Sequence, residues 1–155
     1  ALDDELELLE AYMDLMCYRY PNLHCEYDID PDLGGSLVPN FILQPLVENS
    51  LLHGLKNKGY RGEIVITAKK EGNAIEILIR DSGSGFTDGR KDIIDELLLH
   101  YDKKQAKLEG NSIGILNVQK RIKLLCGPKY GLSYMENETG GVTARLLLPH
   151  EADAK

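Results

Sequence analysis

Apolar residues recur every three or four positions along the first twenty residues of the chain, which is the spacing of one face of an α-helix. The members of this stripe are Leu2, Leu6, Leu9, Met13, Met16 and Tyr20. Acidic residues fill most of the remaining positions, and Pro21 ends the segment. The pattern predicts an amphipathic helix over residues 2–20. Because no capping sequence precedes Leu2, we expect this helix to continue upstream in a longer parent protein.

Shorter apolar runs with strand and turn signals alternate with helical segments along the rest of the chain. Strands are predicted at residues 23–29, 64–70, 74–81, 132–135 and 143–148, and helices at residues 39–56, 91–101 and 113–125. Pro39 suits the first turn of its helix. Hairpins mixed with helices indicate an α+β fold, in which one mixed sheet is covered on one face by helices.

Composition and charge argue against several classes of protein. The 155 residues are about one domain's worth, and their net charge of −7 argues against indiscriminate nucleic-acid binding. No apolar run is long enough to cross a bilayer, and the three cysteines lack the spacing of a zinc site. The charge is uneven, because residues 1–54 hold eleven acids and one base, whereas residues 103–129 hold seven bases and one acid. The basic stretch is a candidate anion site.

The predicted helix at residues 39–56 carries polar side chains beside the face that we expect to pack on the sheet. That face holds Leu43, Leu46, Val47, Ser50, Leu51 and Gly54. Asn49 lies on its flank, and His53 lies one turn further along on the same side. The Asn49 carbonyl oxygen suits a hard cation such as Mg²⁺, but an asparagine bonded to the backbone or exposed to water also explains the position. His53 likewise fits a charge at a helix C-terminus.

A second candidate site is the glycine-rich segment Asp81-Ser82-Gly83-Ser84-Gly85-Phe86, which directly follows a predicted strand. A dinucleotide-binding fingerprint needs a third glycine at position 88, and a calcium loop needs oxygen-bearing side chains at positions 83 and 85, so both are excluded. Two interpretations stay open. Either a buried Asp81 accepts a hydrogen bond from the exocyclic amine of a purine, with the glycines leaving room for the ring, or the segment is a turn that binds nothing.

A third candidate site is the segment at residues 111–118, where a polar loop runs into a helix with Gly114 at its entry. The free N–H groups at a helix N-terminus bind phosphates, and Lys103, Lys104 and Lys107 precede this one. An ordinary capped helix start explains the segment without a ligand.

The order of these three segments, followed by a final hairpin, resembles that of the GHKL ATP-binding fold, and within it the LytS/YehU/YesM-type sensor histidine kinases. Residues 39–54, PNFILQPLVENSLLHG, are similar to that subfamily's N box, whose core reads LQPLVENAxxHG. Residues 81–86 resemble the first glycine box, DNGxG, and residues 112–121 resemble the second, GIGLxNxxxR. Residues 140–149 resemble the closing GGTxV…P strand. The resemblance covers nearly the whole chain and implies a two-layer α/β sandwich, the Bergerat fold.

The resemblance also implies a site for ATP and Mg²⁺. It assigns Asn49 to the Mg²⁺ that bridges the phosphates and Asp81 to the adenine amino group. It places Gly83 and Gly85 at the border of the adenine pocket, and Gly114 where the backbone of a lid approaches the phosphates. Other positions that the resemblance places near the nucleotide are His53, Lys104, Asn117 and Arg121.

Some positions depart from the family pattern. Ser82 replaces an asparagine, Ser112 and Ile115 replace residues of the second glycine box, and Val142 stands where threonine is common. Related ATPases carry a water-activating glutamate at the position that is Pro45 here, which suits a kinase because such a base would promote futile hydrolysis. Glu48, next to Asn49, is a candidate to assist catalysis, although it projects about 100° away around the helix.

The resemblance implies the ATP-binding catalytic domain of a two-component sensor histidine kinase, an enzyme that transfers the γ-phosphate of ATP to a histidine. We expect that histidine on an upstream dimerisation helix absent from this chain, with a response regulator taking the phosphate afterwards. Residues 1–20 are then the connecting helix, and residues 21–155 the catalytic domain. The parent is expected to be a homodimer anchored in the cell membrane, with this domain in the cytoplasm and no nucleic-acid partner.

Two alternatives stay open. The first is a regulatory GHKL module that binds nucleotide without phosphotransfer. The second is an interaction domain, in which the apolar stripe of the first helix is a dimer seam and the glycine-rich loops are only turns.

Overall fold

The structure is a computed structural model that describes residues 1–87, 89–102 and 110–150, without the side chains of residues 110–112. Its helices are α1 (Leu2–Arg19), α2 (Leu43–Asn49), α3 (Arg90–Leu99) and α4 (Gly110–Cys126), and its strands are β1 (Leu23–Ile29), β2 (Gly62–Glu71), β3 (Ala74–Asp81), β4 (Gly131–Glu136) and β5 (Val142–Pro149). A short 3₁₀ turn, η1 (Pro31–Leu33), follows β1. Helix α2 continues as π-helical turns, η2 (Ser50–Leu55), and a 3₁₀ turn, η3 (Lys56–Lys58).

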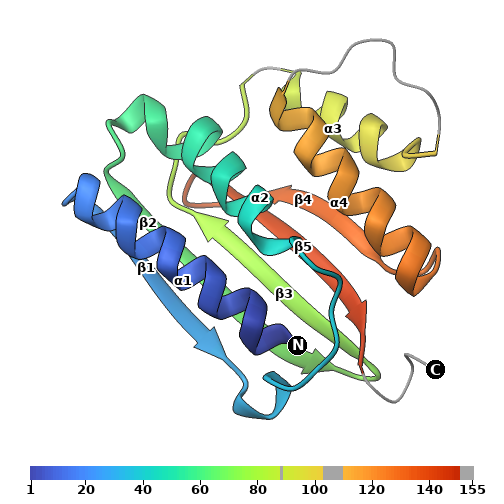
Figure 1. Cartoon of the computed structure of the whole chain (residues 1–155). Coiled ribbons are helices and arrows are strands. Elements are labelled where there is room, and N and C mark those ends of the chain that lie inside the picture. The colour runs from blue at the N-terminus through green and yellow to red at the C-terminus, as the bar shows by residue number, and fades with distance from the viewer. Residues whose placement is uncertain (88, 103–109, 151–155) are drawn as a thin grey trace.

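The strands form one sheet in the order β1-β2-β3-β5-β4, in which β1 runs parallel to β2 and the other neighbours are antiparallel. All four helices lie on the same side of this sheet (Figure 1). Alternate strand residues under the helices are buried, as Ile64 and Ile66 on β2 and Ile77 and Ile79 on β3 show. The predicted α+β fold, a mixed sheet covered on one face by helices, is confirmed.

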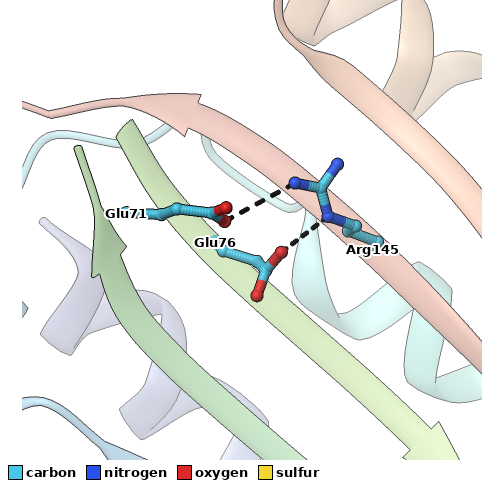
Figure 2. Close-up of polar contacts among 3 residues, drawn as sticks. All are labelled: Glu71, Glu76 and Arg145. Carbon is cyan, nitrogen blue, oxygen red and sulfur yellow. Dashed lines mark hydrogen bonds and ion pairs between the residues drawn. The ribbon is translucent and has the colours of Figure 1, made fainter. Parts of the chain in front are cut away.

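The opposite face of the sheet is open and carries charged side chains in place of a second apolar core. On it, Arg145 of β5 lies between two carboxylates from neighbouring strands (Figure 2). Its Nε is 2.6 Å from Glu76 Oε2 and its Nη2 is 3.6 Å from Glu71 Oε2. Such half-exposed cross-strand ion pairs contribute only about 0.2–1 kcal/mol each to stability. Most of the stability of the sheet therefore comes from the apolar core between the sheet and the helices.

The apolar stripe of α1 packs into the same core. Leu2, Leu9 and Met13 are buried to 1% exposure or less, and helix α1 packs on β1 and α2. Glu5 also links α1 to the segment just before α2, because its Oε1 accepts a hydrogen bond of 2.9 Å from the backbone N–H of Ile42. The stripe is therefore not available as a dimer seam in the folded domain. The proposed boundary between residues 20 and 21 stays a prediction.

The helix predicted at residues 39–56 begins later than expected, at Leu43, and its second half is π-helical. Phe41 has a φ of +58°, a left-handed conformation that stops a helix from starting upstream. Side chains from distant elements hold this conformation: Arg121 of α4 donates hydrogen bonds of 2.5 and 3.2 Å to the carbonyls of Asn40 and Phe41. The placement of Pro39 in the first turn was therefore wrong. The other predicted elements are present with bounds that differ by three residues at most, and those of β1 and β3 are as predicted.

Across the residues that the structure describes, no helix combines the length and the apolar character that a membrane crossing requires.

Candidate functional site

The carboxylate of Asp81 is buried at the end of β3, beneath the π-helical turns of η2. Asp81 is 3% exposed, and its Oδ1 accepts hydrogen bonds from the backbone N–H groups of Gly83, at 2.9 Å, and Val142, at 3.3 Å. Burial raises the pKa of this carboxyl, while the two amides, the Ser50 hydroxyl and the charge of Lys58 oppose the rise. The sequence predicted Asp81 at the end of a strand, and the structure shows that its carboxylate there is a buried hydrogen-bond acceptor. Its second oxygen, Oδ2, accepts no hydrogen bond from a backbone amide of the described residues.

Three glycines allow the backbone to close around Asp81. A Cβ on Gly54 would lie 2.9–3.1 Å from the carboxylate, and one on Gly83 would lie 2.4–2.5 Å from the backbone of Gly54. A Cβ on Gly141, whose φ is +85°, would lie 2.0 Å from the Asp81 carbonyl oxygen. Any side chain at these positions requires the backbone to move, so the glycines are needed for the fold of the site as well as for access to it.

The raised pKa of Asp81 predicts a pH dependence of stability. The folded chain keeps the Asp81 proton to a higher pH than the unfolded chain, in which the ordinary value is 3.8. The folded state therefore binds more protons above that pH, and the Asp81 contribution to stability falls as the pH rises. We expect the free energy of unfolding of the wild type, minus that of Asp81→Asn, to decrease between about pH 4 and pH 7 in urea titrations. A constant or increasing difference would contradict this assignment.

Asn49, the last residue of α2, is 7% exposed, and its Oδ1 is buried without a hydrogen-bond partner among the described residues. A buried acceptor left unpaired costs about 1–3 kcal/mol, so it calls for an explanation. A hard cation that prefers oxygen ligands fits this atom. No group of three or more His, Cys, Asp or Glu side chains able to hold a metal occurs in the described part of the chain. The residues therefore suit an ion that takes one protein oxygen and fills its other positions with phosphate and water, as Mg²⁺ does.

Two neighbouring cavities share Asn49, His53, Gly85 and Phe86 in their walls. The inner one holds about 20 Å³ and is also lined by Asp81, Ser50, Gly54, Tyr134 and Val142. The outer one holds about 330 Å³ and extends along Lys56, Thr87 and Arg90. The inner space suffices for about one water molecule, so a purine reaches Asp81 only if a wall moves. Phe86 closes it, packing edge-on against Tyr134 with ring centres 6.0 Å apart.

A third cavity, about 350 Å³ in volume, lies between α1 and the end of β1. Its lining includes the acids Asp3, Glu7, Glu10 and Asp30. A lining of this charge repels polyphosphates, so the cavities at Asn49 are the better candidates for an anionic ligand.

Two predicted site residues lie away from these cavities. Glu48 accepts a hydrogen bond of 3.1 Å from Gln44, and its charge helps burial to raise the pKa of Tyr12 on α1. Asn117 is exposed on α4. Neither side chain lines the inner or the outer cavity, so their roles stay predictions that the geometry does not support.

The remaining predicted site residues belong to α4 or to the segment before it. Arg121 holds the carbonyls of residues 40 and 41, which makes it a structural link between α4 and the start of α2. Among the described residues, the atom nearest to a Cβ on Gly114 would be Pro45 Cβ at 3.8 Å, so that part of the fold does not require a glycine there. Lys104 and the side chain of Ser112 lie outside the described residues.

Residues that the sequence patterns did not single out also belong to the site. Tyr134 reaches the inner cavity from β4, and its buried hydroxyl has no hydrogen-bond partner among the described residues. Burial raises the pKa of this phenol, the Asp81 charge adds to the rise, and the Arg90 charge opposes it. Lys56 and Arg90 line the outer cavity. The alternation of side chains along a strand predicts that Tyr134 faces the helices. It does not predict which residues of the helices and loops lie next to the Tyr134 side chain.

Comparisons with known proteins show the family to which the chain belongs. The family described as "Histidine kinase-, DNA gyrase B-, and HSP90-like ATPase" matches residues 39–152. The sensor protein LytS of Oceanobacillus iheyensis is 31% identical over 96% of this chain and 25% of its own length. The sensor histidine kinase YpdA of Escherichia coli is 34% identical over 87% of this chain and 22% of its own. The chain thus spans about a quarter of the length of these relatives.

Solved structures share the fold at low sequence identity. The nucleotide-free catalytic domain of the histidine kinase ThkA superposes with a TM-score of 0.70 at 17% identity, covering 99% of this chain and 95% of that one. Full-length ShkA in complex with AMPPNP superposes with a TM-score of 0.63 at 12% identity, covering 97% of this chain and 30% of that one.

Proposed function

This chain belongs to the family of histidine kinase-, DNA gyrase B- and HSP90-like ATPases as an ATP-binding catalytic domain, and we propose that it transfers the γ-phosphate of ATP to a histidine side chain. The observation that carries the proposal is that Asp81 and Asn49, one a buried carboxylate and the other a buried, unpaired amide oxygen, line the same cavity. An amine donor and an oxygen-seeking cation are the ligand features that this pair fits, and Mg²⁺-ATP carries both.

Asp81 selects the base. Its carboxylate accepts a hydrogen bond from the exocyclic amine of adenine, whereas guanine presents a carbonyl oxygen at the equivalent position and would be repelled. The Gly83 and Val142 amides hold the carboxylate through Oδ1, which orients the second oxygen independently of the ligand. Gly85, with a φ of +80°, carries the backbone past the cavity without a side chain in the way of the ring.

Asn49 holds the metal end of the nucleotide. Its Oδ1 is positioned by the last turn of α2, and the residues that follow it change to π-helical geometry, which is typical of functional sites. Bound Mg²⁺ would supply neutralisation of the charge on the phosphate oxygens. The chain's own residues bind and orient the triphosphate so that its terminal phosphorus faces the acceptor.

The acceptor and the further partners lie outside this chain. Pro45 occupies the position of the water-activating glutamate in related ATPases, so the site favours transfer to a side chain over hydrolysis. None of the four histidines lies in the context of a dimerisation helix, and we infer an acceptor histidine upstream in a parent that is a membrane-anchored homodimer. A response regulator would receive the phosphate from that histidine.

Substitution of Asn49 tests the metal assignment. We expect Asn49→Ala to remove most of the Mg²⁺-dependent part of the ATP affinity, about tenfold or more, while the affinity in EDTA changes little. Isothermal titration calorimetry with and without Mg²⁺ measures both quantities. Asn73→Ala, in the turn between β2 and β3, is a matched control that should retain the wild-type Mg²⁺ dependence. An unchanged Mg²⁺ dependence in Asn49→Ala would overturn the assignment.

Phosphotransfer itself is tested with γ-labelled ATP and a longer fragment of the parent that includes the upstream helices. Label that is stable in alkali and labile in acid on a histidine supports the kinase. Tight ATP binding without label would contradict transfer and favour a regulatory nucleotide-binding module.

A further inference from the structure

Two tyrosines stack on each other at the end of the sheet where β1 and β2 begin. Tyr20 follows the last residue of α1, and Tyr60 lies two residues before β2. The centres of their rings are 4.0 Å apart, and the angle between the ring planes is 20°. Because β1 runs parallel to β2, the segments that precede the two strands lie at the same end of the sheet, and the stack joins these segments.

Tyr60 holds a backbone conformation that is unfavourable for its residue type. Its φ is +57°, in the left-handed region where a Cβ crowds the following carbonyl oxygen and where glycine or asparagine is the usual residue. Two contacts keep it there: the stack on Tyr20, and a hydrogen bond of 2.9 Å from the Tyr60 N–H to the Leu55 carbonyl. A tyrosine kept in this conformation indicates that its ring has a role in holding the residues around it.

The residues around Tyr60, which we call the 58–63 segment, bind Ser82 of the glycine-rich segment. The Ser82 N–H donates to the Glu63 carbonyl at 3.1 Å, and the Ser82 Oγ accepts from the Glu63 N–H at 2.9 Å. Lys58 Nζ adds a hydrogen bond of 3.2 Å to the Ser82 carbonyl. A Cβ on Gly62 would lie 2.5 Å from Ser82 Oγ, so the 58–63 segment packs closely on this side chain.

The Asp81 carboxylate depends on the position of Ser82. Ser82 lies between Asp81 and Gly83, whose N–H donates to Asp81 Oδ1 at 2.9 Å. A shift of the 58–63 segment would therefore move the amide that orients the carboxylate. Burial raises the pKa of the Asp81 carboxyl, and the Lys58 charge is one of the influences that oppose the rise. The 58–63 segment thus acts on both the orientation and the charge of Asp81.

We propose that Tyr60, fixed by its stack on Tyr20, is a positioning residue for adenine recognition. Its ring keeps the 58–63 segment against Ser82, which holds the Asp81 carboxylate in place. The inference rests on the function proposed above, and it extends the determinants of base recognition to the end of α1. Neither tyrosine lines the inner or the outer cavity, so both act without touching the nucleotide.

Removal of either ring should weaken ATP binding in a chain that still folds. We expect Tyr60→Gly, in which glycine accepts the left-handed φ, and Tyr20→Leu each to lower ATP affinity about fivefold and to reduce the preference for ATP over GTP. Tyr60→Phe and Tyr20→Phe keep the stacked rings and should bind ATP as the wild type does. Tyr18→Leu is the matched control, because Tyr18 is also on α1 but is 87% exposed, and its ATP affinity should not change.

Titration calorimetry with ATP and GTP measures these affinities, and melting temperatures show whether each variant is folded. Ser82→Ala tests the route, because it removes the acceptor of the Glu63 N–H. The double variant Ser82→Ala/Tyr60→Gly should bind ATP no more weakly than the weaker of the two single variants, since both changes break one linkage. Tyr60→Asn, in which asparagine also tolerates a left-handed φ, replaces Tyr60→Gly if the latter does not fold.

Failure of this inference is distinguishable from failure of the proposed function. The positioning role is overturned, and the proposed function stands, if the wild type binds ATP but Tyr60→Gly or Tyr20→Leu keeps its affinity. Equal proportional losses for ATP and GTP, losses of the same size in the Phe variants, or additive losses in the double variant would also overturn it. If the wild type binds no ATP, the proposed function fails, and this inference fails with it.

Discussion

Gly141→Ala should lower the melting temperature by about 10 °C and abolish measurable ATP binding. The new Cβ would lie 2.0 Å from the Asp81 carbonyl oxygen and 3.1 Å from its Oδ1, at a φ of +85°. The left-handed conformation costs about 1–3 kcal/mol, and relieving the contact must displace the end of β3. A total of about 3–4 kcal/mol corresponds to roughly 10 °C in a chain of this size. Differential scanning calorimetry and ATP titration measure the two effects.

Gly72→Ala is the matched control for this prediction. Gly72 also has a positive φ, +61°, but a Cβ there would have no atom within 4 Å. It should carry only the conformational cost, about 1 kcal/mol, and keep ATP binding. Equal melting temperatures for the two variants would show that the close approach to Asp81 contributes nothing.

Asp81→Asn should weaken ATP binding about 10- to 100-fold and reduce the preference for ATP over GTP. Its amide oxygen can still accept from Gly83 and Val142, which keeps the local fold. The amide nitrogen then faces the exocyclic amine of adenine, so a hydrogen bond to a charged acceptor, worth about 1.5–3 kcal/mol, is replaced by a donor–donor contact. Titration calorimetry with ATP and GTP at pH 7 gives the two affinities.

Asp28→Asn is the control for the loss of charge. Asp28 is exposed on β1, where its carboxylate is 3.6 Å from the Lys69 ammonium, and strand β2 separates it from Asp81 on β3. ATP affinity should not change in this variant. Wild-type ATP affinity in Asp81→Asn would contradict the assignment of Asp81 to the base.

Site residues whose positions follow from the spacing of residues within one helix or strand could be predicted from the sequence. Asn49 follows from its place on the flank of a helix, and Asp81 from its place at the end of a strand before two glycines. The structure buries both and brings them to one cavity, although they are 32 positions apart in the chain. Their roles toward a nucleotide stay proposals that the experiments above test.

Other parts of the site depend on contacts between elements. Tyr134 and Gly141 come from the last hairpin, and nothing in their own neighbourhoods predicts that one lines the Asp81 cavity and the other touches the Asp81 backbone. Glu48 is the opposite case, a residue that the sequence suggested and the geometry does not support. It was a candidate because it is adjacent to Asn49 in the sequence. Helical geometry instead places it near Gln44 and the α1 residue Tyr12.

Apolar periodicity and turn signals located the helices α1 to α4 and the strands β1 to β5, because the residues that share one face of a helix or a strand are near one another in the chain. The surface on which each element packs, and the residue at which a helix begins, depend on residues that are distant in the sequence. Arg121 and Glu5 bind the backbone just before α2 and delay its start to Leu43, and the sheet covers the α1 stripe that would otherwise suit a second copy. These outcomes are set by long-range packing, in which burial and hydrogen-bond satisfaction outweigh local preference.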